Sequence, residues 1–373
     1  MRIVHLIYDD LQNPWLAGGG AVRADEIYRR LTGRHEVTLV TGAFPGSDPA
    51  GTRTGVRLVR VGRGSSYVRS RLQYCRGAVA ALKGLAWDVW VHEFSAFAPL
   101  WPAAELRRRG VLFFYHFVGH HALRKHPLVG AVSWLAETLT LRAYPRIVTI
   151  SPSVQDEVRR RLQGRNAEVD CVYTGVDPRY FSLVPQEEPY LLYLGRLDLH
   201  TKGLDLLVAA FARAAAAHPG VTLKIAGRGT PGNREAVLRL AVRAGVEPRV
   251  ELVGGVDEDQ KGELLRRCLF VCMPSRYEGW GIVAVEAAAA AKPVLGTRIA
   301  GLRDAVRDGE TGVLVPSGDV PALAEAMSVL LADPERRRRM GERGREWARR
   351  FDWDQIAVDQ EQVLLRAAGR AAG

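Results

Sequence analysis

The sequence predicts an α/β protein of two doubly wound domains, each built on a parallel β-sheet. Near-continuous apolar runs such as RIVHLIY, HEVTLVT and WDVWVHEF alternate with amphipathic stretches such as AVRADEIYRRL and SVQDEVRRRLQ. Apolar runs of this kind indicate strands that are buried on both faces, and their alternation with helices indicates a sheet covered by helices on each side. The 373 residues are enough for two cores of this type.

The boundary between the domains is predicted where this alternation stops. The segment VDPRYFSLVPQEEP (176–189) contains three prolines and has no period, which is typical of a linker. The alternation resumes with YLLYLGR, VTLKIAG and VELVGG. We therefore expect a first domain over residues 1–180, a second over 187–350, and a last helix over 354–370.

Three further features of the chain concern its location and its packing. No signal peptide or membrane-spanning apolar run is recognisable, which predicts a cytoplasmic protein. The helix predicted from ERRRRMGERGREWARRF (335–351) is charged nearly all round, so we expect it to be solvated. Two of the four cysteines, Cys268 and Cys272, fall in a strand-like run and are expected to be core residues.

The positive charge is concentrated in the first half of the chain. Residues 1–180 hold 25 basic and 15 acidic side chains, whereas residues 181–373 hold 27 and 26. A one-sided field of this kind indicates an anionic partner, such as a membrane surface or a phosphorylated acceptor. A solvated arginine-rich surface is the alternative, since arginine supplies 46 of the 52 basic residues. No aromatic platform or recognition-helix motif supports nucleic-acid binding.

The stretch YLGRLDLHTKGLDLL places two cations between a strand and a helix. Arg196 and Lys202 follow the strand, and Gly203 opens the helix. Ligands of open parallel sheets bind beyond the carboxyl ends of the strands, where two facing domains would form a cleft. A loop with two cations before a helix N-terminus suits a diphosphate. A basic surface loop is the alternative interpretation.

Two glutamates follow in SRYEGWGIVAVEAAAAAKPV (275–294). Glu278 precedes a glycine-rich turn at the end of a strand, and Glu286 lies in a helix of small apolar residues. Ionised carboxylates only accept hydrogen bonds, so they suit the hydroxyl groups of a sugar or a ribose. The alternatives are a helix-capping acid for Glu278 and an acid paired with a buried arginine for Glu286.

The first domain offers a glycine run and several histidines. Gly18, Gly19 and Gly20 precede a predicted helix but come too long after the strand for a dinucleotide-binding turn, so a flexible loop at the cleft is expected. The run FFYHF is expected to end a strand at His116. His120, His121 and His126 have no carboxylate partner at ligand spacing, so no metal site is predicted.

Taken together, these motifs resemble those of the family-4 retaining glycosyltransferases, which have the GT-B fold. The shared pattern is GR followed by KG, and then P-S-x-x-E-G-x-G with a second glutamate eight residues after the first. PVLGTRIAGLRDAVRDGETGVLVPSGD (293–319), TISPSVQDEV (149–158) and YTGVDPRYF (173–181) are also similar to family segments. The stretch 118–146 does not match closely and is a candidate acceptor or membrane element.

The resemblance implies two Rossmann-like domains facing across a cleft, with the helix 354–370 completing the first, acceptor-side domain. It also implies roles for single residues. Arg196 and Lys202 would contact the diphosphate of a nucleotide sugar, Glu286 the ribose, and Glu278 the transferred sugar. As a set, the implied catalytic residues are His116, Glu278, Arg196 and Lys202, and the implied donor-binding residues are Gly18, Gly19, Gly20, Arg196, Lys202, Gly227, Gly254, Glu278, Gly279, Trp280, Gly281, Ile282 and Glu286.

The implied reaction is metal-independent transfer of a hexose, with retention of configuration, from a donor such as UDP-glucose or GDP-mannose to a hydroxyl acceptor. No cofactor is implied, and the acceptor would be lipid-linked, a polysaccharide precursor or a secondary metabolite. Two other interpretations stay open at this point. One is another GT-B enzyme, such as a nucleotide-sugar epimerase or an inverting transferase. The other is a catalytically silent sugar-nucleotide-binding protein.

Overall fold

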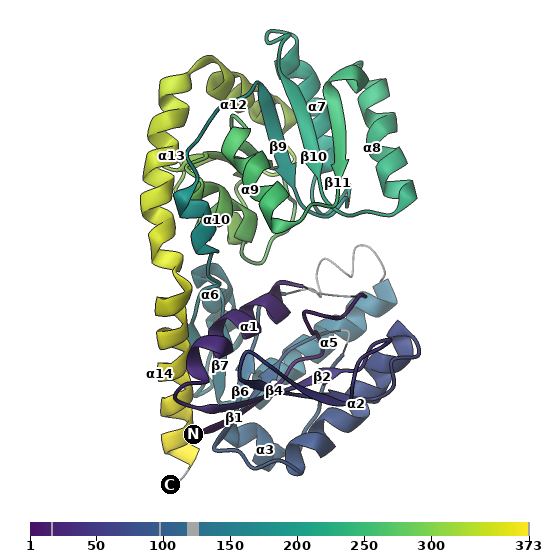
Figure 1. The fold of residues 1–373 in the computed structure, drawn as a ribbon, viewed down its shortest axis with the longest axis vertical. Helices are drawn as coiled ribbons and strands as arrows, with labels where there is room; N and C mark the ends of the chain where they lie inside the picture. The colour runs from purple at the N-terminus through teal and green to yellow at the C-terminus, as the bar shows by residue number, and fades with distance from the viewer. Residues whose placement is uncertain (16–17, 97, 118–126, 372–373) are drawn as a thin grey trace. The chain divides into compact units, whose positions relative to one another are not determined.

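The computed structural model describes residues 1–15, 18–96, 98–117 and 127–371, which form two compact units (Figure 1). Unit 1 comprises Met1–Thr174 and Trp353–Gly373, and unit 2 comprises Gly175–Asp352. The chain therefore passes from unit 1 to unit 2 and returns to unit 1 for its last helix. In the described ranges, no helix is both long enough and apolar enough to cross a membrane.

Unit 1 is built on an eight-stranded sheet with helices on both faces. The strand order is β3-β4-β2-β1-β5-β6-β7-β8, and all pairs are parallel except β3 with β4. The strands are β1 (Arg2–Leu6), β2 (Glu36–Gly42), β3 (Ala50–Arg53), β4 (Val56–Val61), β5 (Val89–Glu93), β6 (Gly110–Phe113), β7 (Arg146–Thr149) and β8 (Glu168–Cys171). The helices are α1 (Gly19–Leu31), α2 (Tyr67–Lys83), α3 (Ala104–Arg109), α5 (Pro127–Ala143), α6 (Pro152–Arg161) and α14 (Trp353–Ala371).

Unit 2 is built on a six-stranded, all-parallel sheet in the order β11-β10-β9-β12-β13-β14. The strands are β9 (Tyr190–Leu194), β10 (Thr222–Ala226), β11 (Val250–Gly254), β12 (Val271–Met273), β13 (Val294–Thr297) and β14 (Gly312–Val315). The helices are α7 (Leu204–Ala215), α8 (Pro231–Arg243), α9 (Glu258–Arg267), α10 (Ile282–Ala289), α11 (Ala300–Ala305), α12 (Val320–Ala332) and α13 (Pro334–Ala348), with 3-10 turns η1 (Pro178–Ser182), η2 (Glu247–Arg249) and η3 (Arg349–Phe351). The prediction of two doubly wound α/β sheets is confirmed.

Local sequence signals explain where many of these helices begin. Thr230 caps α8 with its hydroxyl on the Asn233 N–H, and Pro231 follows at the first helical position. Asp257 and Gln260 form a reciprocal capping box at the start of α9. Such caps satisfy backbone N–H groups that have no partner within the helix, so the helix starts are fixed before any tertiary contact is made.

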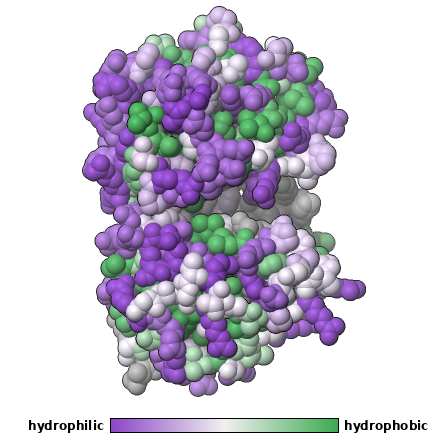
Figure 2. All heavy atoms as spheres, in the orientation of Figure 1, coloured by the Kyte–Doolittle hydropathy of each residue, from purple (hydrophilic) through white to green (hydrophobic). Residues whose placement is uncertain are grey.

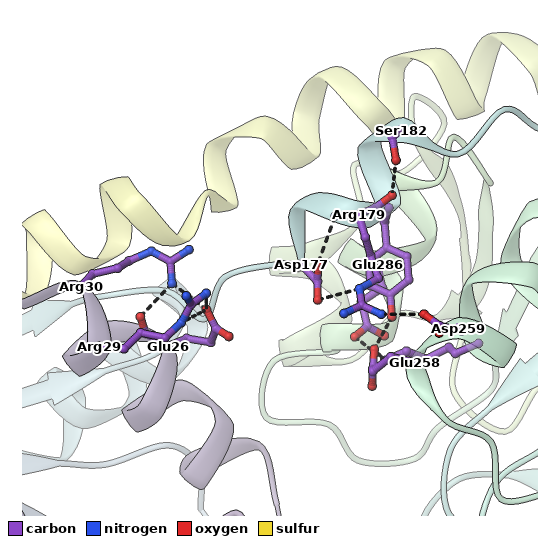
Figure 3. A network of polar contacts seen from close by, with 11 residues as sticks. Glu26, Arg29, Arg30, Asp177, Arg179, Ser182, Glu258, Asp259 and Glu286 are labelled. Carbon is purple, nitrogen blue, oxygen red and sulfur yellow. Dashed lines mark hydrogen bonds and ion pairs between the residues drawn. The ribbon is translucent and has the colours of Figure 1, made fainter. Parts of the chain in front are cut away.

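The final helix is tied to the first unit by both packing and charge. Helix α14 packs on α1. The Arg30 guanidinium joins Asp354 of α14 at 2.5 Å, and it also joins Glu26 at 2.6 Å (Figure 3). The Glu26–Arg30 pair is one turn apart on α1, so Arg30 is held in place for the contact with α14.

Helix α13 is not the fully solvated helix that its charge pattern predicts. Arg337 is buried and pairs with Glu187 at 2.7 Å. A Cβ atom on Gly341 would lie 2.1 Å from the carbonyl oxygen of Ala291, and Gly344 lies against Ala288. The expectation is wrong because two glycines let α13 lie close against α10 and the residues that follow it.

Three smaller expectations are also corrected, and one strand is added. Gly19 and Gly20 belong to the first turn of α1, and only Gly18 precedes it. Strand β6 ends at Phe113, so His116 lies in the loop beyond the strand. Strand β3, which the apolar pattern did not reveal, is an exposed antiparallel edge strand. The segment 176–189 contains η1 rather than an unstructured linker.

Three glycines lie close together at the carboxyl end of the unit 2 sheet. Gly195 and Gly227 directly follow β9 and β10, Gly254 is the last residue of β11, and the N–H of Gly227 donates to the carbonyl of Gly254 at 2.6 Å. Gly227 has φ +151°, and a Cβ atom there would lie 1.7 Å from the carbonyl oxygen of Gly195. The backbones approach so closely that only glycine fits.

We therefore predict that Gly227→Ala destabilises unit 2, because both the dihedral angles and the backbone contact exclude a side chain. The loss of unfolding free energy should be roughly 3 kcal/mol, measured by urea unfolding. Gly220→Ala is the matched control, since a Cβ atom there meets nothing within 4 Å. Equal unfolding midpoints for the two variants would contradict the assignment.

Candidate functional site

The loop after β9 and the loop after β12 close on each other at the carboxyl end of the unit 2 sheet. Gly203 caps α7 with φ +67°, and a Cβ atom there would lie 2.0 Å from the carbonyl oxygen of Pro274. The N–H of Arg276 donates to the carbonyl of Thr201 at 3.0 Å, and its guanidinium holds Asp205 at 2.7 Å. The backbone of both loops is therefore fixed by contacts that do not involve a ligand.

Lys202 and Glu278 meet directly between these two loops. The Lys202 ammonium forms an ion pair with Oε1 of Glu278, and the hydroxyl of Ser275 donates to the same oxygen at 3.1 Å. Both side chains are half-buried, so the pair is shielded from water but remains accessible. The structure thus brings together two of the predicted site residues, 76 positions apart in the sequence.

Arg196 lies on the same loop as Lys202 but has a different environment. Its carbonyl accepts a hydrogen bond from the Tyr193 hydroxyl at 2.8 Å, which fixes its backbone. Its side chain is exposed, and the structure shows no ion pair or hydrogen bond from its guanidinium to any residue within the described ranges. Of the two predicted cations, Lys202 is therefore ion-paired with Glu278, whereas the Arg196 guanidinium has no partner among the described residues.

The glycine-rich turn after Glu278 leads into α10. Gly281 adopts φ +71° and precedes Ile282, the first residue of the helix, and no side chain caps this end. The Trp280 indole is buried and packs edge-on against Phe351 with ring centroids 5.1 Å apart. Trp280 therefore anchors the turn with its side chain, and the N–H groups of the first helical turn stay uncapped by side chains, as an anion site requires.

Glu286 belongs to a second lysine–glutamate contact, on the next turn of α10. Its Oε1 accepts from the Lys261 ammonium at 2.8 Å, and Lys261 also pairs with Glu258 at 3.0 Å. Glu258 in turn accepts from the buried Tyr180 hydroxyl at 2.5 Å. Figure 3 shows Glu286 and Glu258 near Asp177, which caps η1, and near the η1 residue Arg179. The alternative interpretation of Glu286 is an acid paired with a buried arginine, whereas its partner in the structure is a lysine.

Burial and charge act against each other in this second contact. Burial raises the pKa of Glu286, and the Lys261 ammonium opposes that rise. Burial also works to lower the pKa of Lys261, but the Glu286 and Glu258 carboxylates outweigh it, so the pKa is raised. The lysine is therefore firmly protonated beside a carboxylate that needs a counter-charge.

Sequence reasoning did not single out Lys261 or Tyr180. A usable signal was present, because the chain has only 6 lysines among 52 basic residues. A compact ammonium fits where the broader guanidinium does not, so a lysine retained in an arginine-rich chain points to a restricted position. Lys202 and Lys261 each contact one glutamate of the predicted pair.

In unit 1, two carboxyl groups flank the glycines at the start of α1. The N–H of Gly18 donates to Oδ2 of Asp9 at 2.7 Å. A Cβ atom on Gly20 would lie 2.5 Å from Oε1 of Glu93, whose other oxygen accepts from the Tyr115 hydroxyl at 2.7 Å. These contacts make the glycine run an ordered helix start rather than the flexible loop that the sequence suggested.

The remaining predictions for unit 1 concern histidines. The side chain of His116 is exposed. His120, His121 and His126 lie outside the described residues. No group of His, Cys, Asp or Glu suited to a metal ion occurs in the part of the chain that is described.

Comparison with known proteins agrees with this architecture. The family described as "Glycosyltransferase Family 4" matches residues 17–180, and the family described as "Glycosyl transferases group 1" matches residues 179–347. The two matches join end to end and cover both units, and the chain belongs to the family-4 glycosyltransferases.

Two similar curated proteins come from species of Mycobacterium. The chain is 35% identical over 240 residues to a glycogen synthase of Mycobacterium tuberculosis, covering 63% of the chain and 56% of that protein. It is 34% identical over 224 residues to the phosphatidyl-myo-inositol mannosyltransferase of Mycobacterium leprae, covering 58% and 59%. The chain thus spans little more than half the length of these relatives.

Solved structures show the same fold at low identity. The sucrose-phosphate synthase from Thermosynechococcus elongatus has a TM-score of 0.83 and 22% identity, with both chains covered in full. HepE of Anabaena, solved with UDP and glucose, has a TM-score of 0.77 and 18% identity over 98% of this chain and all of that one. The fold is GT-B.

The carboxyl group of Asp9 gives a test of the unit 1 geometry. Burial raises its pKa from 3.8 to about 7, although the N–H groups of Gly18 and Asp10 favour the ionised form. The folded pKa exceeds the unfolded one, so the folded state prefers the protonated acid, and stability falls as pH rises from about 4 to 7.

We predict that Asp9→Asn, which keeps a carbonyl for the Gly18 N–H, removes this fall. Thermal unfolding of unit 1 across that range should show the wild type losing stability relative to the variant. Parallel curves for both proteins would show that Asp9 is not the group responsible.

Proposed function

We propose that this protein is a metal-independent retaining hexosyltransferase that moves a hexose from a nucleotide sugar to a hydroxyl acceptor. The observation that supports this most is the Lys202–Glu278 ion pair, which joins the cationic loop after β9 to the turn that opens α10. A nucleotide sugar needs cations for its diphosphate and hydrogen-bond acceptors for its hydroxyls. The two loops supply both within one unit.

In this proposal, Arg196 and Lys202 bind the diphosphate together with the N–H groups at the start of α10. Arg196 is exposed and without a described partner, so it is ready for a phosphate. Lys202 is shared between Glu278 and the incoming phosphate. Charge-assisted hydrogen bonds of this type strengthen as negative charge develops on the leaving group, which lowers the barrier.

The hydroxyl groups of the donor are assigned to the two glutamates. Glu278, with the N–H groups of the turn Gly279–Ile282, contacts the transferred sugar, and Glu286 contacts the ribose. The base is assigned to the surface at Gly227 and Gly254, with the Arg234 guanidinium nearby. The solved HepE complexes with UDP and UDP-glucose make a uridine nucleotide a reasonable first probe.

Retention of configuration is proposed to follow from attack on the face that the diphosphate leaves. The leaving phosphate oxygen takes the proton of the acceptor hydroxyl, so no protein nucleophile is required. The protein contributes by positioning the reactants and by stabilising the charge on the phosphate. We assign the acceptor to unit 1, where the family resemblance implies roles for His116 and the glycines 18–20. No cofactor is required in this scheme.

We predict that Arg196→Ala and Lys202→Ala each lower kcat/KM by roughly 100-fold, the loss of about 3 kcal/mol of transition-state stabilisation. The assay is release of nucleoside diphosphate from UDP-, GDP- and ADP-hexoses, first with water as a slow acceptor. Arg276→Ala is not a suitable control because Arg276 ties the two loops together. Arg228→Ala, on the neighbouring loop after β10, is the comparison of choice.

Near-normal rates in either variant would remove the diphosphate assignment. The same assays in EDTA should retain activity, because protein cations meet the charge of the diphosphate. Strict dependence on an added divalent ion would contradict the metal-free scheme. Nucleotide binding with no donor cleavage at all would favour the catalytically silent alternative, and a product of inverted configuration would favour another GT-B chemistry.

We further propose that unit 1 docks on an anionic membrane surface. Helix α5 buries polar side chains and exposes apolar ones. Leu128 is 85% exposed and Val132 is 68% exposed, whereas the buried polar residues are Ser133, Glu137 and Thr140. Leu135 and Leu139 extend the same face. Figure 2 shows, for contrast, that hydrophilic side chains dominate the face of the molecule turned to the viewer.

Basic side chains lie beside this apolar face. A pocket of about 350 Å³ next to it is lined by Trp134, Arg142 and Arg161 among others. An apolar face bordered by tryptophan and arginine suits the boundary between lipid tails and anionic headgroups. This fits the excess of basic residues in the first half of the chain.

Val132→Asp should abolish sedimentation of the full chain with phosphatidylglycerol-containing vesicles, and wild-type binding should weaken in high salt. Val242→Asp, at a position of α8 with 63% exposure, is the matched control. Wild-type protein that stays in the supernatant under every condition would indicate a soluble acceptor and a solvated arginine-rich surface.

A further inference from the structure

The two oxygens of the Glu286 carboxylate have different environments. Glu286 is 7% exposed, and its Oε1 accepts from Lys261 at 2.8 Å. Its Oε2 is buried and has no hydrogen-bond partner among the residues that the structure describes. A buried carboxylate oxygen without a donor costs free energy, which a ligand hydroxyl would recover.

Several contacts hold the Lys261 ammonium in place, so it fixes the position of the Glu286 carboxylate. Its ammonium lies 3.0 Å from Glu258 and 5.4 Å from the centre of the Tyr180 ring. The Tyr180 hydroxyl closes the arrangement by donating to Glu258 at 2.5 Å. The lysine thus bridges α9, α10 and η1, and it can move little without breaking several contacts.

We propose that Lys261 is a positioning residue that holds the Glu286 carboxylate in place through Oε1, so that Oε2 is left to accept from a hydroxyl of the donor ribose. This rests on the proposed function, in which Glu286 contacts the ribose. It adds to that assignment, because Lys261 fixes both the orientation and the charge of the carboxylate that meets the ribose.

The positive charge of Lys261 also affects the protonation of Glu286, and therefore its contact with the ribose. Burial favours the protonated form of Glu286, and Lys261 supplies the nearby positive charge that opposes it. A protonated carboxyl is a weaker acceptor for a hydroxyl than a carboxylate is. Without the lysine, nucleotide affinity should therefore depend on pH near neutrality and should rise as the pH rises.

The experiment compares nucleotide affinities of the full chain by titration calorimetry between pH 6 and 8.5. The probe is whichever of UDP, GDP and ADP binds the wild type most tightly, together with its 2′-deoxy and 3′-deoxy forms. The variants are Lys261→Met, Lys261→Arg and Glu286→Gln. Lys224→Met is the matched control, because Lys224 also pairs with a glutamate, Glu251, at 3.6 Å in the same unit.

For the wild type, we expect at least one deoxy analogue to bind about tenfold more weakly than the parent nucleotide. Lys261→Met should lose about tenfold in affinity at pH 6, recover part of it by pH 8.5, and discriminate less against the deoxy analogues. Lys261→Arg should keep a flat pH profile, since it keeps the charge. Lys224→Met should behave as the wild type.

The outcomes separate this inference from the function on which it rests. Wild-type affinity in Glu286→Gln, or no binding of any of the three nucleotides, would remove the ribose assignment itself. A weakened Glu286→Gln beside a Lys261→Met that matches Lys224→Met would leave that assignment intact and overturn the role of Lys261. Two deoxy analogues that both bind the wild type as tightly as the parent nucleotide would also remove the ribose assignment.

Discussion

The ion pair between Lys202 and Glu278 is the contact on which the organisation of the donor site depends. It joins loops that follow β9 and β12, which are neighbours in the sheet although far apart in sequence. The backbone prepares this meeting, because Gly203 allows one loop to touch Pro274 of the other. In the proposed function, the Lys202 ammonium supplies charge to the phosphate of the donor. The Glu278 carboxylate accepts hydrogen bonds from the hydroxyl groups of its sugar.

The second lysine–glutamate contact, between Lys261 and Glu286, also pairs an ammonium with a carboxylate but is more deeply buried. Glu286 is more buried than Glu278, so its charge depends more on a neighbouring cation. Such a carboxylate suits a part of the ligand that does not change during the reaction, because it binds ground state and transition state alike. Glu278, in the shallower and more accessible contact, suits the sugar at which bonds break.

The fold could be predicted because its signals are local. Apolar strands such as YLLYL and capped helices such as the one after Asp257 are evident in the chain itself. Contacts between distant segments were not predictable, since the Lys202–Glu278 and Lys261–Glu286 pairs depend on how loops and helices pack. The same reason explains the misjudged α13, where Gly341 and Gly344 permit close packing that a count of charges conceals. Helix α5 belongs to the stretch that the sequence marks as a candidate acceptor or membrane element, and the structure exposes several of its apolar residues.

The scarcity of lysine offers a direct test of the central claim that Lys202 binds the donor phosphate while Lys261 holds Glu286. Lysine labelled with ¹⁵N would give side-chain ammonium signals from at most six positions, assignable by single Lys→Arg variants. On titration with UDP, GDP or ADP, the account predicts that the Lys202 signal shifts as its ammonium gains a phosphate partner, while the Lys261 signal stays nearly unchanged. Saturating nucleotide binding that leaves the Lys202 signal in place would contradict it.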